Sequence, residues 1–115
     1  MEAAPQHIAA LERANRVRLA RAATKRKVAS GELSAADVVE ADPWEMRSAL
    51  VFELLMSQHR WGRARCRRTL LALGLPESKR MGTLTDRQRT ALAAVLRTAQ
   101  ARRLAASERY REGGA

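Results

Sequence analysis

Apolar residues recur at helical spacing along most of the chain, and no stretch shows the alternation of a half-buried β-strand. Residues 4–30 predict one long helix, because Pro5 suits a first turn and Gly31 suits the position after a helix end. Its thin apolar stripe, which Asn15 interrupts, consists of Ile8, Leu11, Leu19 and Ala22. A helix this polar cannot be mostly buried, so we expect an arm that projects from the core.

Capping residues mark the next two helices. Ser34 is an N-cap candidate for a short helix over residues 35–41. The residues D-P-W-E at 42–45 offer an N-cap, a first-turn proline and a capping-box glutamate for a helix of about residues 43–58. This helix should form the hydrophobic centre, through Met46, Ala49, Leu50, Val51, Leu54 and Leu55.

Two glycines, Gly62 and Gly74, bound another short helix over residues 63–73. Its inward-facing side chains are predicted to be Cys66, Leu70 and Leu73. A lone cysteine excludes an internal disulfide and a Cys-rich zinc site. Because Cys66 shares helical spacing with Leu70, it is interpreted as a small core residue rather than a reactive thiol.

Thr85 opens the final helix through a capping box with Gln88. The buried stripe of this helix is predicted to be Leu92, Val95, Leu96 and Ala99. Beyond about Leu104 the chain turns polar and is expected to fray. The prediction is an all-α fold with a basic helical arm, a compact helical core and a polar tail, over residues 1–31, 32–104 and 105–115.

The charge balance points to a polyanionic partner. Lys and Arg number 22 against 12 Asp and Glu, giving a formal net charge of +10, and arginine, which suits bidentate phosphate contacts, dominates. His7 and His59 are far apart and lack partner ligands, so we expect no metal and no cofactor. No run of about 20 apolar residues and no signal peptide is evident. We expect a cytoplasmic protein without a membrane partner, and we take it to be a monomer.

Arginines cluster around the turn at Gly62. They are Arg60 before the glycine, Arg63 and Arg65 just after it, and Arg67 and Arg68 further along the predicted helix. A helix N-terminus already concentrates positive partial charge and unpaired N–H groups there. We predict that a nucleic-acid phosphate backbone docks on this turn. Further contacts are expected from Lys79 and Arg80 in the next loop, and from one face of the first helix through Arg18, Arg21 and Lys25. A solvated surface helix is the alternative for the last three, against which the scarcity of balancing acids counts.

The chain resembles the actinobacterial-type integration host factor family. The likeness begins in the Ala/Arg-rich first helix and continues through S-G-E-L-S-A-A-D-V-V-E-A-D at residues 30–42. It is strongest over residues 54–84, especially in L-x-L-G-L-P-E-S-K-R-M at residues 71–81, and it continues in R-Q-R-T-A-L at residues 87–92. It spans about residues 9–97 and leaves the C-terminal extension outside.

This resemblance implies a helix-two-turn-helix or helix-hairpin-helix-like module and largely sequence-independent binding of double-stranded DNA. It also implies bending or compaction of DNA in the nucleoid, and a role in phage integration beside a recombinase or integrase. The second glycine of the family's G-V-G hairpin matches Gly62, and the basic residues after it match Arg63 and Arg65. Lys79 and Arg80 match the start of its R-R-L-R basic loop.

Two departures from the family pattern stand out. Arg60 replaces the first hairpin glycine and His59 the proline before it, although glycines there let backbone N–H groups approach phosphate closely. Gly82 occupies the third basic position of the loop. The chain is therefore interpreted as a divergent member, for which a phage or mobile-element origin is one hypothesis.

Other interpretations of these residues stay open. Trp61, at the tip of the turn, either inserts into the minor groove or anchors the turn to the core. Helix-hairpin-helix modules also occur in DNA glycosylases and nucleases, but no acid occurs between Glu53 and Glu77 and no paired catalytic constellation exists, so we expect no enzyme. An RNA- or ribosome-associated protein and a phage-encoded protein-interaction module are the remaining alternatives.

Overall fold

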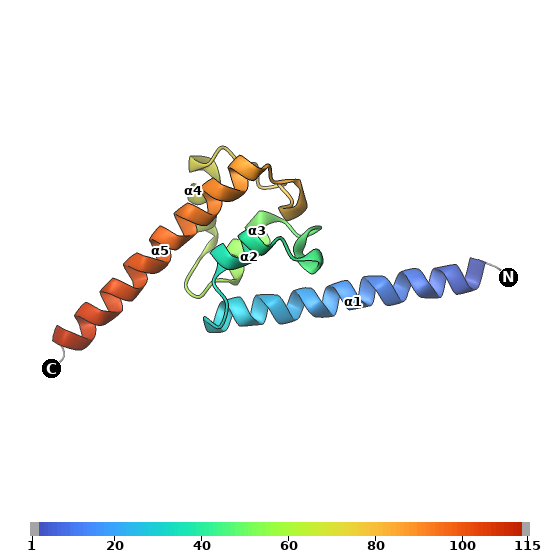
Figure 1. The fold of residues 1–115 in the computed structure, drawn as a ribbon, viewed down its shortest axis with the longest axis horizontal. Coiled ribbons are helices and arrows are strands. Elements are labelled where there is room, and N and C mark those ends of the chain that lie inside the picture. The colour runs from blue at the N-terminus through green and yellow to red at the C-terminus, as the bar shows by residue number, and fades with distance from the viewer. Residues whose placement is uncertain (1–2, 114–115) are drawn as a thin grey trace.

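The computed structural model describes residues 3–113, which form five α-helices and two short 3-10 helices (Figure 1). Their order is α1 (Ala3–Ser30), α2 (Ala35–Ala41), η1 (Trp44–Met46), α3 (Val51–Ser57), α4 (Arg63–Ala72), η2 (Met81–Thr83) and α5 (Asp86–Gly113). The predicted all-α class is confirmed. Within the described residues, pairing of the β type is limited to an isolated bridge between Leu50 and Arg80.

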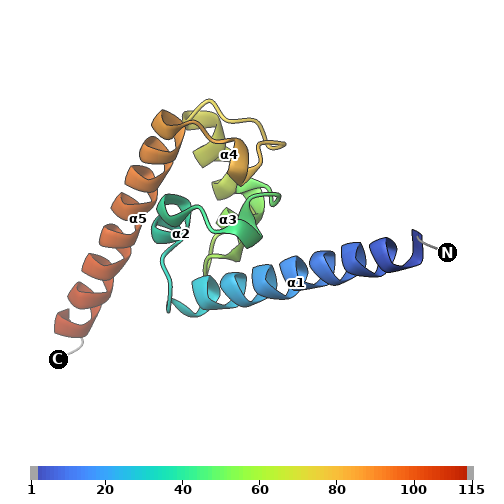
Figure 2. The same ribbon diagram turned by 45° about the vertical axis from the view of Figure 1, so that its right-hand side comes forward.

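Two 28-residue helices, α1 and α5, extend beyond a compact group made by α2, α3 and α4. The two long helices diverge, so the start of α1 and the end of α5 lie at opposite extremes of the described residues (Figures 1 and 2). The longest dimension is 69 Å and the shortest 23 Å. The apolar side chains of the first half of α1, among them Ile8 and Leu11, are exposed, as expected for an arm.

Local capping fixes several helix ends where the sequence predicted them. Gly31 has φ +84° and ends α1. The Ser34 hydroxyl accepts the backbone N–H of Asp37 at 3.0 Å and caps α2. At the start of α5 the capping box is complete, because the Gln88 side chain accepts the Thr85 N–H at 2.9 Å and the Thr85 hydroxyl accepts the Gln88 N–H at 3.1 Å.

The continuous helix predicted over residues 43–58 is wrong. The structure forms η1, then a turn over residues 47–50, then α3. This segment pairs with residues 79–82, through Val51 N–H to the Lys79 carbonyl, Met81 N–H to the Ala49 carbonyl and Gly82 N–H to the Arg47 carbonyl, each at 2.9 Å. These hydrogen bonds to a distant segment replace intrahelical ones, so the helix is interrupted.

The predicted capping role of the residues at 42–45 is also wrong. Asp42 has φ +48° and ends α2 instead of starting a new helix. Pro43 is extended and precedes η1, and Glu45 is buried rather than capping a helix. The acid and the proline therefore form a sharp link between α2 and η1.

The core lies between α2, α3, α4 and the first half of α5. Its fully buried large side chains are Met46, Leu54, Leu55, Leu70, Met81 and Leu92. The stripe predicted for α5 is wrong at Val95, which is 39% exposed, while Ala93 is buried in the contact with α2. A small side chain suits that contact because it lets the two helix backbones approach closely.

The fraying expected beyond about Leu104 is wrong for the described residues, since α5 continues as a helix to Gly113. Alanine, arginine and glutamate dominate this stretch and favour helix without burial. Leu104 and Tyr110 are 56% and 83% exposed. Residues 101–113 therefore form a helical overhang that extends away from the core (Figure 1).

Candidate nucleic-acid interface

The turn at residues 58–62 joins α3 to α4. It is closed by the Trp61 N–H, which donates to the Gln58 carbonyl at 3.2 Å. Arg60 has φ +64°, the left-handed conformation, and its side chain is exposed. The resemblance places a glycine at this position, and the structure gives the reason: the turn needs a conformation that favours glycine and costs other residues about 1 kcal/mol.

The N-terminus of α4 is open to an anion. Gly62 is its N-cap and provides no side-chain hydrogen bond, and the first turn contains no acid. Arg63 and Arg65 are exposed in that first turn. Unpaired N–H groups, the helix dipole and two guanidiniums therefore share one small surface.

Gly62 has open space around it. A Cβ built on this residue would meet no atom within 4 Å, and its backbone conformation is extended. The fold itself thus has no steric need for glycine here. A ligand that approaches the backbone closely would create such a need.

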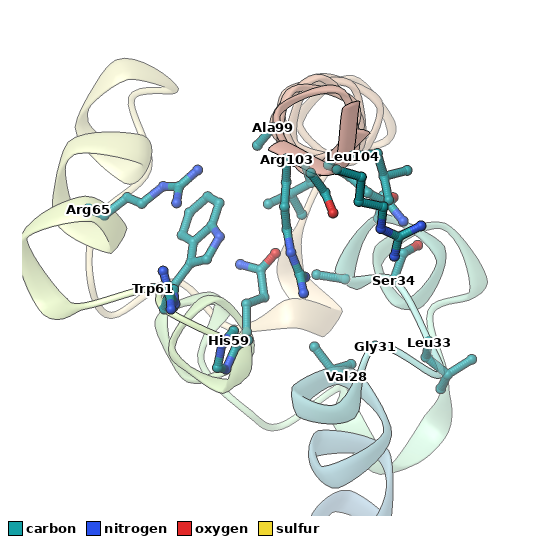
Figure 3. A pocket seen from close by; sticks show the side chains of 18 residues that line it. Val28, Gly31, Leu33, Ser34, His59, Trp61, Arg65, Ala99, Arg103 and Leu104 are labelled. Carbon is teal, nitrogen blue, oxygen red and sulfur yellow. The ribbon is translucent and has the colours of Figure 1, made fainter. Parts of the chain in front are cut away.

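Trp61 is half-buried and packs against the core. The Arg65 guanidinium lies 4.0 Å from the centroid of its indole ring, in cation–π geometry. Figure 3 shows the two side chains side by side. These contacts favour the interpretation of Trp61 as an anchor of the turn over insertion into a groove.

One loop cation and one first-helix cation, Arg80 and Arg21, both contact Ser48. Arg80 donates to the Ser48 carbonyl, and Arg21 donates to the Ser48 hydroxyl and, at 3.1 Å, to the Glu45 carbonyl. The structure therefore brings together two groups that are far apart in sequence. It also shows that Arg21 and Arg80 hold parts of the fold in place, a role that local sequence did not indicate.

The remaining two first-helix candidates differ from each other. Lys25 pairs with Glu53 at 3.5 Å and so fastens α1 to α3. Arg18 is exposed and donates only to its helical neighbour Asn15, at 2.6 Å. Of the three, Arg18 is thus the most available to a partner.

Gly82 and Lys79 complete the loop. A Cβ on Gly82 would lie 3.0 Å from the Cβ and the carbonyl oxygen of Arg47, so the missing third basic residue has a steric reason. Lys79 is half-buried, and its carbonyl accepts the Val51 N–H. The loop residues therefore pack against the rest of the fold as well as contributing positive charge.

Cys66 lies one turn behind the candidate site and is buried. Burial raises the pKa of its thiol above the ordinary value, and the charge of Arg65 opposes this to a smaller extent. A protonated thiol is a weak nucleophile, which agrees with a core role.

No cluster of three or more His, Cys, Asp or Glu side chains within residues 3–113 could hold a metal ion. Over the same residues, no helix combines the length and the apolar character that a membrane crossing requires.

No protein-family model matches the sequence, and no curated protein matches it significantly. A solved structure does match: "Structure of sIHF bound to an 8bp palindromic DNA", at 25% identity and a TM-score of 0.67. The match covers 74% of this chain and 98% of that one. The chain has an sIHF-like fold. Membership of the actinobacterial-type family stays a prediction, as do the roles of the individual turn, loop and first-helix residues.

Proposed function

We propose that this sIHF-like protein binds double-stranded DNA through phosphate contacts with little sequence preference. The observation that carries the proposal is the open N-terminus of α4, where Gly62, Arg63 and Arg65 lie together without an acid. The sIHF structure is described as bound to DNA, and the net charge of +10 fits the same partner.

The contact surface has two parts. The turn surface comprises Arg60, Trp61, Gly62, Arg63 and Arg65, with Trp61 supporting the others from below. The second surface comprises Arg18, Arg21, Lys25, Lys79 and Arg80, of which Arg21 and Arg80 both contact Ser48. Two separate surfaces suit an architectural role, because contacts spaced along a duplex can bend it or join two segments.

The biological setting follows from this role. We propose a cytoplasmic, nucleoid-associated protein that bends or compacts DNA and acts without catalysis. Assembly with a recombinase or integrase on DNA, as in phage integration, is the corresponding proposal for a larger complex. Phosphate contacts fix position but carry no sequence information, which suits such a general factor.

A salt series on random-sequence duplex tests the proposal. If about six phosphates are contacted, the logarithm of the association constant should fall with the logarithm of salt concentration with a slope of about −5. Binding of structured RNA is measured at the same salt concentrations. Preference for RNA, or a slope near zero on duplex, would contradict the proposal.

Gly62→Ser tests the turn itself without changing charge. Serine is a good N-cap, so the fold should keep its stability. The serine hydroxyl would, however, accept hydrogen bonds from the N–H groups that we assign to phosphate. We expect duplex affinity to fall roughly tenfold on all sequences, as for the loss of one charge-assisted hydrogen bond. Undiminished affinity would show that the α4 amides do not contact DNA.

A further inference from the structure

A cleft of about 660 Å³ lies between the turn and the overhang. Its walls come from the turn with the start of α4, the end of α1, the start of α2, and α5 from Leu96 onward. Figure 3 shows Arg103 and Leu104 on the α5 wall, with Trp61 and Arg65 on the opposite wall. The overhang, whose residues beyond about Leu104 were expected to fray, therefore forms one side of a cleft beside the candidate site.

Four arginines line this cleft, and they are Arg60, Arg65, Arg103 and Arg111. No carboxylate lines it, since the two acids of the overhang, Glu108 and Glu112, are not part of its walls. Among the ion pairs of the described residues, none involves these four arginines. The cleft is therefore an unneutralised cationic site that fits an anionic ligand.

The side chains exposed on the cleft walls distinguish between the possible classes of anionic ligand. Half of the apolar lining residues, among them Leu96 and Ala36, are buried, and Leu104 is the one large apolar lining residue that is well exposed. An acidic amphipathic helix would find little apolar surface here. Trp61 is half-buried and Arg65 covers one face of its ring, so the cleft offers a nucleobase little indole surface, and His59 is the other aromatic side chain of the lining. Phosphate groups need neither surface and suit guanidinium donors.

We infer that the cleft holds the sugar–phosphate backbone of double-stranded DNA, gripped between the turn and the overhang. The inference rests on the proposed function and extends it, because it makes the overhang a DNA-binding arm. Arg103 and Arg111 contact phosphates from one side, and Arg60 contacts them from the other. The duplex that docks on the α4 N-terminus thereby gains contacts along a second helix.

A pair of matched variants tests this inference in the full-length protein. Arg103→Ala with Arg111→Ala removes two cleft charges. Arg102→Ala with Arg109→Ala removes two charges from the same helix that do not line the cleft. Circular dichroism checks that both variants remain helical, as alanine substitution should ensure.

We expect the cleft variant to bind random duplex at least about tenfold more weakly at moderate salt, with a salt slope shallower by about 2. The control variant should lose about threefold or less. Hydroxyl-radical footprints should be shorter for the cleft variant than for the control. Equal losses in both variants would mean only general charge attraction and would overturn the inference.

Two further measurements keep this result separate from the proposed function. If Arg63→Glu with Arg65→Glu abolishes duplex binding while the cleft variant binds normally, the inference fails and the proposed function stands. If the unmodified protein ignores duplex in dilute buffer, both fail. Binding of poly-glutamate that exceeds duplex binding and depends on Arg103 and Arg111 would assign the cleft to an acidic polypeptide and overturn the inference.

Discussion

Arg60 adopts a backbone conformation that costs an L-amino acid free energy. Its φ of +64° places the Cβ close to the following peptide, a strain of about 1 kcal/mol that glycine avoids. We predict that Arg60→Gly raises the free energy of unfolding by up to about 0.5 kcal/mol, after allowance for the greater entropy of glycine in the unfolded chain. Urea denaturation measures the change.

Arg60→Ala is the control for this prediction, because alanine also loses the guanidinium but keeps the Cβ. It should give no comparable gain in stability. If both variants lower duplex affinity equally, the Arg60 side chain itself contacts DNA. A fall in stability for Arg60→Gly would show that the turn is unstrained.

Gly82 meets the opposite constraint. A Cβ at this position would lie 3.0 Å from two atoms of Arg47, one of them a backbone oxygen that also accepts the Gly82 N–H. Restoring the charge that the resemblance expects, through Gly82→Arg, should lower the free energy of unfolding by about 1–3 kcal/mol. Thermal unfolding measures it, with Gly62→Ser as the control at an uncrowded glycine. Equal stability of Gly82→Arg and the parent protein would contradict the prediction.

At the scale of elements, the sequence predicted the helix ends that neighbouring residues determine. Gly31, Ser34 and the Thr85–Gln88 box act within one turn of their own position, and the helix ends that they mark are confirmed. The break between η1 and α3 depends on hydrogen bonds to residues 79–82, about thirty positions away. Helical periodicity and capping motifs depend on neighbouring residues and cannot reveal a hydrogen-bond partner this far along the chain. The sequence therefore predicted an unbroken helix.

The candidate site shows the same division. The turn and its arginines could be predicted because their charge and the start of α4 are neighbours in sequence. The sequence did not show that Arg21 and Arg80 both donate to Ser48, or that Lys25 pairs with Glu53, because each contact joins distant segments. The cleft was missed for a different reason: a polar, alanine-rich end was expected to fray instead of forming a wall.

Two arginines of α5 contact the α2 region in very different surroundings. The side chain of Arg89 is 15% exposed and donates to the carbonyls of Val39 and Met81 at 2.6 and 3.1 Å. Arg97 is exposed and pairs with two acids of α2, and its hydrogen bond to Glu40 is the main cause that raises the pKa of Arg97 above its ordinary value.

We therefore predict unequal effects for the same substitution. Arg89→Met should lower the free energy of unfolding by about 2–4 kcal/mol, because two buried carbonyls lose their donors. Arg97→Met should have a much smaller effect that shrinks further in high salt, as for an exposed ion pair. Urea denaturation at low and high salt measures both. A larger loss for Arg97→Met would show that the surface pair, and not Arg89, fastens α5 to the core.

The whole molecule combines a small core with two long helices that diverge from it. The buried side chains of α5 are Leu92, Ala93 and Leu96, all in its first half. Its second half consequently contributes charge and reach but little buried apolar area, which is the main source of folding free energy. The arrangement separates the part that folds from the parts that extend over a partner.

Ending the chain after Leu104 tests this separation. Because no side chain described beyond Leu104 is fully buried, the free energy of unfolding should change by less than about 0.5 kcal/mol, as for most surface changes. Helical circular dichroism should fall by the amount expected for the missing turns, and duplex affinity should fall because Arg111 is absent from the cleft. If the shortened chain unfolds at a markedly lower urea concentration, the overhang is part of the core. Unchanged stability with reduced affinity would show that the second half of α5 serves binding rather than folding.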